Sequence, residues 1–594
     1  MRPMLPASRM TVCTDSTFKS WKVFLKVYFH SGTDWNRAPP AVKTEKTLLL
    51  LSYNNWDDYT IRTTFNAAFY HEGKRILDFS LKLLIENDTN SPVKLNALCK
   101  EGWDGYFPIP DTNYVSVPSD IEFYDALTTT LGVPEARKVL LLVRDAGYLL
   151  NILQDNAAEK LIEHDHFATS PLREAGARKS FHDGWKAFSG NSQSIQDFTL
   201  NIPGRDVENV NPVKFRFNSD TLPYDINVLI GPNGIGKSHT LKNLVAYWLG
   251  VAAGSHTQLS KSKHQPFDVN PNISRLILMS YSPFEDFVLD LSNTTLKDKT
   301  AYKYFGFRRG STSALGKRQS TISRNLPASD SVESIFKAMA DDDAYGFLST
   351  WTSKFKTIMD VLQPALGFEK ISVEVNPKAE LPLSLKAHLI KGKDEKTYIH
   401  LTPVSHPKLL KLKDELFNAI NTKAGVIFLN GVERLDLSSG QRLFVYMVIN
   451  IVGQIKAESL IIVDEPELFL HPTFEVEFIA LLKKVLAAFN SKAILATHSL
   501  AIAREIPANC MHVYRNGQHG LEIDHPPFET FGGNMQRISS YVFGDSKVTK
   551  PFAQWIEDAV QEAGSPKGLL AKLKDEVNEE MTIKILNSSV VDGR

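Results

Sequence analysis

The sequence predicts an α/β fold built on a parallel sheet, with a separate α+β region before it. Three short apolar runs of strand length support this prediction, at residues 225–230, 460–463 and 492–497. The first run is followed by residues 241–249, whose apolar positions repeat with helical spacing. Strands that alternate with helices in this way are typical of parallel sheets.

A glycine-rich octet, Gly231-Pro-Asn-Gly-Ile-Gly-Lys-Ser238, lies between the first strand and the first helix. Glycines in this context let backbone N–H groups turn inward around a β-phosphate, and the start of the helix adds to the attraction. We expect Lys237 to reach the β- and γ-phosphates and the Ser238 hydroxyl to ligate Mg²⁺. The residues expected to bind a nucleotide here are Gly231, Asn233, Gly234, Gly236, Lys237, Ser238 and His239.

Polar side chains follow the other two strands. Asp464 and Glu465 come directly after residues 460–463, and His498 follows residues 492–497. Asp464 would hold Mg²⁺ directly or through water, and Glu465 would polarise an attacking water as a catalytic residue. His498 would sense a γ-phosphate as the second catalytic residue.

A serine-rich segment, Leu437-Ser-Ser-Gly-Gln441, precedes a helix-like run at 442–452. We expect Ser438 to cap this helix and Gly440 to permit close approach of a backbone. A capped helix start is an anion site complementary to a γ-phosphate. The residues expected to contribute to nucleotide binding are Ser438, Ser439, Gly440 and Gln441.

These four segments, in this order, resemble the motifs of ABC-type ATPases. By position, the octet matches the Walker A motif, the serine-rich segment matches the signature motif with Ser439 in place of its usual first glycine, and Asp464 and Glu465 match Walker B. His498 matches the switch histidine. The superfamily's lid glutamine has no counterpart, because residues 276–282 lead to Pro283 without a glutamine, and that metal contact is left unassigned.

In this superfamily the signature motif of one subunit covers the ATP that the phosphate loop of another holds. The resemblance therefore implies ATP and Mg²⁺ as ligands and a sandwich of two copies of this chain, or a larger assembly. It also implies hydrolysis of ATP to ADP and phosphate.

The residues after Walker B point to one branch of the superfamily. The continuation Glu467–Pro472 resembles the branch that includes RecF, SMC-like proteins and the ATPases of the overcoming-lysogenisation-defect class. No apolar run reaches the roughly eighteen residues that a membrane span needs, and no secretory pattern begins the chain. Three widely spaced cysteines suggest a reducing cytoplasm. Lys+Arg and Asp+Glu both total 67, so overall charge decides nothing about nucleic acid.

We expect three regions in the chain. These are an α+β domain of unassigned role at 1–190, an ABC-type ATPase domain at 191–548 with a compact α+β insertion at 285–425, and a helical tail at 549–594. The polar residues 189–194 are the expected first boundary. Further expected elements are strands at 47–52, 76–85 and 369–376, and helices at 121–131, 135–152, 331–362 and 569–580.

A basic stretch lies in the expected insertion. Residues 303–324 contain no acid and carry Lys303, Arg308, Arg309, Lys317, Arg318 and Arg324. This composition would suit a flexible loop that grips nucleic-acid phosphates, and a disordered insert or partner-binding loop is equally compatible. The residues after 506 contain no Asp-x-Asp cluster, so we expect no Toprim-type nuclease within this chain.

Residues 525–533 and 537–543 resemble segments of stand-alone ATPases of bacterial anti-phage defence. The family that they resemble most is PtuA, the ATPase of Septu systems, some of them retron-linked. The resemblance implies a slowly hydrolysing sensor whose nucleotide state controls a separate HNH nuclease, PtuB. One alternative is a RecF- or SMC-like repair or maintenance ATPase that binds DNA directly. Another is a scaffold for which nucleotide is only a structural ligand.

Overall fold

The structure is a computed structural model. It describes residues 25–588 apart from 32–38, 59, 189–194, 204–209, 253–264, 290–300, 313–317, 347–350, 378, 380, 382–384, 386–387, 404, 406–408, 411–412, 518–519 and 545–550. The chain forms two compact units, one of residues 1–193 with 339–354 and one of residues 194–338 with 355–594. The boundary expected at 189–194 lies outside the described residues, and the three expected regions stay a prediction.

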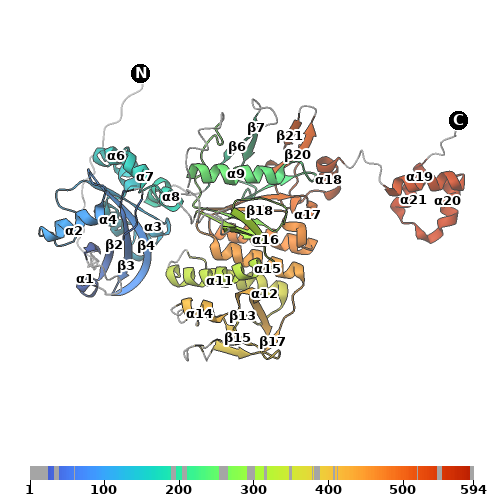
Figure 1. The fold of residues 1–594 in the computed structure, drawn as a ribbon. Helices are drawn as coiled ribbons and strands as arrows, with labels where there is room; N and C mark the ends of the chain where they lie inside the picture. Colours follow the sequence, from blue (N-terminus) through green and yellow to red (C-terminus); the bar gives the residue numbers. More distant parts are fainter. Residues whose placement is uncertain are drawn as a thin grey trace, which may run out of the picture. The chain divides into compact units, whose positions relative to one another are not determined.

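The first unit contains a five-stranded sheet with helices beside it (Figure 1). The strands, in their order across the sheet, are β1 (Leu25–His30), β2 (Thr47–Tyr53), β3 (Thr64–His71), β4 (Lys74–Ile85) and β5 (Tyr114–Pro118). Only the first pair is parallel. Its helices are α1 (Pro40–Thr44), α2 (Ser91–Lys100), α3 (Glu122–Leu131), α4 (Val133–Val143), α5 (Ala146–Tyr148), η1 (Leu149–Leu153), α6 (Asn156–Ile162), α7 (Asp165–Thr169), α8 (Ala175–Asp183) and η2 (Gly184–Phe188).

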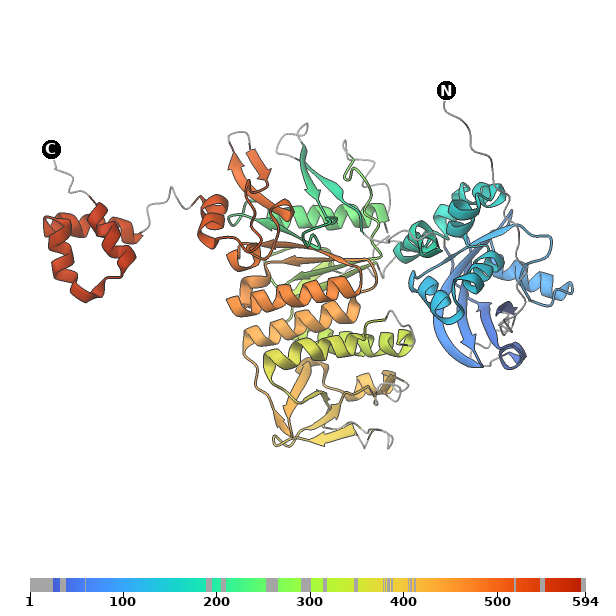
Figure 2. The ribbon, with the colours of Figure 1, turned by 180° about the vertical axis from the view of Figure 1, so that it is seen from behind.

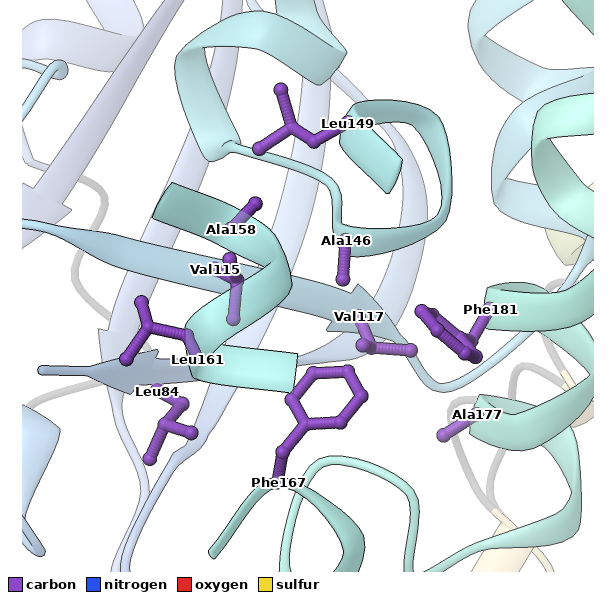
Figure 3. Packing of buried hydrophobic residues seen from close by; sticks show 10 residues of the cluster. All are labelled: Leu84, Val115, Val117, Ala146, Leu149, Ala158, Leu161, Phe167, Ala177 and Phe181. Carbon is purple, nitrogen blue, oxygen red and sulfur yellow. The ribbon is translucent and has the colours of Figure 1, made fainter. Parts of the chain in front are cut away.

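Apolar side chains from β4, β5 and the helices form one core of this unit. Figure 3 shows Phe167 and Phe181 beside Val115 and Val117 of β5. The strands expected at 47–52 and 76–85 and the helix expected at 121–131 are confirmed. The single helix expected at 135–152 is wrong, because Arg144 adopts a left-handed conformation (φ 51°) that ends α4.

The second unit contains a seven-stranded sheet with helices on both faces, which confirms the α/β prediction (Figures 1 and 2). Its strands, in order across the sheet, are β10 (Tyr302–Gly306), β9 (Arg275–Ser280), β18 (Ser459–Asp464), β19 (Lys492–Thr497), β8 (Ile226–Ile230), β20 (Met511–Gly517) and β21 (Gly520–Asp524). All neighbours are parallel except β20 and β21. Helix α9 (Lys237–Ala252) covers one face, and α15 (Ser439–Gln454) and α16 (Pro472–Ala488) lie on the other.

The strand register aligns the ends of four strands at one edge of this sheet. Thr497 pairs with Ile230, and Asp464 pairs with both Ala496 and Ser280. Parallel strands deliver their carboxyl ends to the same edge, which is where open α/β sheets bind ligands. The remaining elements of the core are the hairpin of β6 (Phe198–Pro203) and β7 (Val210–Phe215), and α17 (Leu500–Ala503), η5 (Pro466–Phe469), η6 (Ala508–Cys510) and α18 (Met535–Phe543).

The segment between β10 and β18 adds a helical layer and a second, antiparallel sheet, and two strands of that sheet lie beyond the expected insertion at 285–425. The sheet has the order β14 (Leu389–Lys391), β15 (Thr397–His400), β13 (Lys370–Glu374), β16 (Val426–Asn430) and β17 (Glu433–Arg434). The helices are α11 (Leu326–Tyr345), α12 (Lys354–Leu366), α14 (Lys413–Ala419) and η4 (Thr422–Ala424). The strand expected at 369–376 is confirmed as β13, but the helix expected at 331–362 is two helices.

Two further expectations are corrected. The basic stretch is not a loop throughout: β10 joins the main sheet, and β11 (Arg308–Thr312) pairs with β12 (Arg318–Ile322). The single tail helix expected at 569–580 is wrong, because the tail contains α19 (Pro551–Ala563), α20 (Pro566–Leu573), η7 (Lys574–Glu576) and α21 (Glu579–Asn587). These helices share a small core of Ile556, Val560, Leu569 and Ile585. Among the described residues no helix is both long and apolar enough to span a bilayer.

An ion pair lies in the interior of the first unit. The side chains of Asp58 and Lys82 are both fully buried, and Lys82 Nζ lies 2.8 Å from Asp58 Oδ2. Burial alone would raise the pKa of Asp58, but Lys82, Ser170 and Arg173 together hold it below its ordinary value. The aspartate is therefore charged and links β4 to the segment before α8.

Removing one member of this buried pair should destabilise the first unit. We expect Asp58→Ala to lower its free energy of unfolding by about 3–5 kcal/mol, because Lys82 would stay buried without its main partner. Hydrogen exchange of the β4 amides in increasing urea measures this loss. The matched control is Lys138→Ala, whose pair with Glu135 is largely exposed and should contribute less than about 1 kcal/mol. Equal losses in the two variants would contradict a structural role for the buried pair.

Candidate nucleotide site

The glycine-rich octet forms the turn between β8 and α9. At Gly231 a Cβ atom would lie 2.6 Å from the carbonyl oxygen of Tyr514 on β20, so no larger residue fits without displacing that strand. Gly236 has a φ of 110°, which residues with a side chain rarely adopt. Asn233 and His239 are exposed. The loop therefore has the strand–turn–helix context that a phosphate site requires.

Lys237 folds back onto this loop. Its side chain is buried, and Nζ donates to the carbonyl oxygens of Gly231 at 2.8 Å and Pro232 at 3.0 Å. Burial lowers the pKa of Lys237, and the nearby acids Glu465, Glu467 and Asp464 oppose that shift. The Lys237 ammonium group is therefore hydrogen-bonded to two neutral carbonyl oxygens of the loop. A charged phosphate oxygen could replace these acceptors.

Ser238 and Asp464 meet across 226 residues of sequence. The Ser238 hydroxyl donates to Asp464 Oδ1 at 2.9 Å, and the Ser280 hydroxyl lies 3.5 Å from Oδ2. Asp464 is buried, and burial raises its pKa to about 7, with Glu465, Glu285 and Glu467 adding to the shift and the Ser238 hydrogen bond opposing it. The expected pair of Mg²⁺ ligands is thus in direct contact.

The oxygen atoms around Ser238 fit a hard divalent cation. A hydroxyl and a buried carboxylate are ligands that Mg²⁺ accepts, and Mg²⁺ beside phosphates usually takes only one or two protein ligands. No cluster of three or more His, Cys, Asp or Glu side chains suited to a metal occurs in the part of the chain that the structure describes. Burial raises the pKa of Asp464 most, the nearby acids add to the shift, and a cation would neutralise that negative charge.

Glu465 and His498 lie at adjacent strand ends. Glu465 follows Asp464 in a left-handed conformation (φ 50°), and its N–H donates to the carbonyl oxygen of Ala496 on β19. His498 follows Thr497, and its side chain is 38% exposed, so the ring is open to a ligand. The structure thus brings both expected catalytic residues to the edge that carries the phosphate loop.

The signature segment caps its own helix, as expected. The Ser438 hydroxyl accepts from the Gln441 N–H at 3.3 Å, and Gln441 Oε1 accepts from the Ser438 N–H at 2.9 Å. Ser438 and Ser439 are exposed. Among the described residues, no hydrogen bond or ion pair joins residues 437–441 to the phosphate loop of the same chain. The serine-rich segment and the phosphate loop therefore do not complete one another within one chain.

Sequence reasoning missed Glu467. Its Oε1 atom accepts from the His498 backbone N–H at 2.7 Å and lies 3.2 Å from ring Nδ1. Ring Nδ1 makes no hydrogen bond with the described residues, so the carboxylate holds His498 through its backbone N–H. The sequence does show a second glutamate two positions after Glu465. Only the three-dimensional structure places this glutamate beside His498.

A second missed residue is Glu285, five positions after β9. Its Oε2 atom lies 2.6 Å from Lys242 Nζ on α9, and its charge contributes to the raised pKa of Asp464. It occupies the region where the lid glutamine was sought. A search for any oxygen ligand after this strand, rather than for glutamine alone, would have found it.

The basic stretch is partly engaged within the chain. Arg308 Nη1 donates to the carbonyl oxygen of Glu285 and lies 3.1 Å from Asp286 Oδ1. Arg309 is exposed. The side chains of 311–320, which include Lys317 and Arg318, lie outside the described residues. Contact between this stretch and nucleic acid stays a prediction.

The raised pKa of Asp464 predicts how stability depends on pH. Because the folded protein without nucleotide holds this proton up to a pH of about 7, it binds more protons than the unfolded chain between that pH and the ordinary aspartate pKa. This group therefore makes stability fall as the pH rises through that interval. Asp464→Asn, which cannot ionise, should unfold at a higher temperature than wild type at pH 8. Its free energy of unfolding should exceed that of wild type by at most about 4 kcal/mol there, and the difference should vanish towards pH 4.

Thermal unfolding without nucleotide or Mg²⁺ at both pH values measures this difference. Asp360→Asn is the control, since Asp360 is exposed on α12 and should give no pH-dependent difference. If Asp464→Asn and wild type have the same stability at pH 8, ionising the buried carboxylate does not destabilise the folded protein.

Glu467 should act through His498. We expect Glu467→Ala to lower ATP turnover roughly tenfold or more while leaving nucleotide affinity nearly unchanged, because the backbone at His498 loses its hydrogen-bond acceptor and the ligand contacts remain. Glu467→Gln keeps an acceptor for the His498 N–H, so its ATP turnover should lie between that of wild type and that of Glu467→Ala. Phosphate release and nucleotide titration separate these effects. Wild-type turnover in Glu467→Ala would exclude the positioning role.

Part of this chain is similar to a known protein family and to known proteins. Residues 226–504 match the family model described as "AAA domain, putative AbiEii toxin, Type IV TA system". Protein ea59 of Escherichia phage lambda is 21% identical over 511 residues, which cover 85% of this chain and 87% of that protein. Similar solved structures include the SMC head domain from Thermotoga maritima, with 12% identity, 57% and 100% of the two chains covered and a TM-score of 0.23.

A nucleotide-free ATP-binding cassette from an ABC transporter is also similar, with 14% identity, 60% of this chain and 98% of that chain covered, and a TM-score of 0.24. Residues 226–504 are thus similar to an AAA domain, and they contain the parallel sheet with its phosphate loop.

Proposed function

We propose that this protein is a regulatory ATPase that closes an ATP sandwich between two copies of the chain. The observation that carries the proposal is the Ser238–Asp464 contact, with Glu465 and His498 at the neighbouring strand ends. Bound Mg²⁺–ATP supplies the phosphate bond to be broken and a cation that neutralises the acids. Lys237 leaves its two carbonyl partners to hold phosphate oxygens, and Ser238 and Asp464 hold the cation.

The remaining roles follow from where the side chains lie. Glu465, at the end of β18, orients and polarises the attacking water as its general base. Glu467 holds the backbone N–H of His498, and the half-exposed imidazole ring contacts the terminal phosphate. Glu285 is the proposed lid contact, an oxygen ligand in place of the glutamine that the superfamily uses.

The second copy is proposed from the exposed start of α15. Its capping box holds Ser438 and Gln441 in place. The exposed Ser439 hydroxyl and the neighbouring N–H groups can donate hydrogen bonds to an anion that approaches from solvent. The described residues show no hydrogen bond or ion pair between these groups and the phosphate loop of their own chain, and the resemblance to ABC-type ATPases favours the γ-phosphate held by another copy as their ligand. ATP would then join the two protomers, and hydrolysis would loosen them.

A role in defence against phage is the finer part of the proposal. The family description mentions a putative AbiEii toxin, and the resemblance of residues 525–543 to PtuA agrees with such a role. The separate HNH nuclease that this ATPase would control stays a prediction from that resemblance. Direct DNA binding is the alternative function; in the basic stretch Arg308 is paired with Asp286, while Arg309 and Arg324 are exposed.

The sandwich predicts opposite effects for two variants. Glu465→Gln should bind ATP but hydrolyse it roughly a hundredfold more slowly, so that an ATP-bound dimer accumulates. Lys237→Ala should show neither turnover nor ATP-dependent dimers. Phosphate release and light scattering after size exclusion, with and without ATP, measure both. Glu557→Gln, an exposed carboxylate on α19, is the control. Wild-type hydrolysis by Glu465→Gln, or a monomer at saturating ATP, would contradict the proposal.

A further inference from the structure

A cavity of about 900 Å³ lies beside the start of α15, within the second unit. Its walls come from the segments after β9 and β10, from the turn before α11, from β16 and β17, and from α15. None of the residues of the phosphate loop, and neither Asp464, Glu465 nor His498, lines it. It is therefore a second recess, separate from the phosphate loop, although Ser439 of the signature segment lines it.

The charges around this cavity are strongly unbalanced. Arg324, Lys423, Arg434 and Arg442 line it, and the carboxylate among the lining residues is Asp436. Arg434 lies 3.7 Å from Glu374, and Arg442 Nε donates to the Leu437 carbonyl oxygen. Within the described part of the chain, Arg324 and Lys423 have no hydrogen bond or ion pair, and both are exposed. Cations that converge without internal partners favour an anionic ligand.

The remaining walls are apolar. Phe307 and Tyr446 present aromatic rings, and Val426, Phe428 and Leu443 add aliphatic and aromatic surface. A volume of this size is typical of small-molecule sites, which combine apolar walls with a few converging polar groups. A ligand that satisfies both kinds of wall has a flat apolar part and at least one negative charge. A nucleotide has this combination, since its base can pack on the rings while its phosphates meet the guanidinium groups.

We propose that this cavity is a second nucleotide-class site, which binds its ligand independently of the phosphate loop. The ligand also touches two parts of the ATPase machinery, because Ser439 of the signature segment and Pro283 near the proposed lid contact both line the cavity. An occupied cavity would tie the start of α15 to the loop after β9. This regulatory consequence, unlike the binding itself, rests on the proposed ATP sandwich.

The test uses the full chain carrying Lys237→Ala, in which the phosphate loop of every copy is disabled. The probe is ADP with a fluorescent N-methylanthraniloyl label, titrated against the variant. We expect saturable binding to remain. Adding Arg324→Glu and Lys423→Glu should weaken that binding tenfold or more, because each removes a charged hydrogen-bond donor and introduces repulsion. The control Lys391→Glu reverses an exposed charge on β14, outside the cavity, and should leave the affinity within about twofold.

Two results would overturn the proposal. One is the absence of saturable probe binding in Lys237→Ala, which would assign all nucleotide binding to the phosphate loop or to the sandwich. The other is an equal affinity in the cavity variant and the Lys391→Glu control. Phosphate release by the wild-type chain is measured in parallel. A wild type without turnover, together with a Lys237→Ala variant that still binds the probe, would remove the proposed function and leave this inference standing.

Discussion

The register of the parallel strands is the constraint on which the rest of the site depends. Asp464 pairs with Ala496 on one side and with Ser280 on the other, and Thr497 pairs with Ile230. These strands are buried along their length, so their apolar residues fix the register. A slip of one residue would turn alternate side chains to the opposite face of the sheet and separate Asp464 from Ser238. One hydrophobic ladder thus aligns motifs that lie hundreds of residues apart.

The same edge concentrates acidic side chains. Burial raises the pKa of Asp464, and Glu465, Glu285 and Glu467 add to that shift, while Lys237 lies near the acids and Lys242 pairs with Glu285. Glu465 adds a left-handed backbone conformation, which is uncommon for a residue with a side chain. Such an arrangement is unfavourable without a ligand and becomes favourable when a cation and phosphates enter. Under the proposed function, affinity for Mg²⁺–ATP would come at the expense of stability in the empty state.

The sequence predicted what local pattern determines and missed what only packing determines. The phosphate loop, the acid-bearing strand and the Ser438 cap are short and local, so their residues alone indicated them. The break at Arg144 and the two-helix form of 326–366 have no comparable signal. The basic stretch was expected as a loop from its charge, yet Tyr302 and Phe305 are buried and β10 pairs with β9. Glu285 and Glu467 escaped notice because their roles depend on neighbours far away in the sequence.

The capping box also changes what the signature segment can offer a second copy. Both Ser438 Oγ and Gln441 Oε1 are engaged with backbone N–H groups of the same turn. Gln441 therefore positions the helix start. The groups left to contact a phosphate are the Ser439 hydroxyl and the backbone of Gly440. Arg442, one residue further on, is held by the Leu437 carbonyl oxygen and lines the basic cavity. The turn at residues 437–442 would thus contact the phosphate through Ser439 and line the cavity through Arg442. A ligand bound in the cavity would therefore affect the position of Ser439.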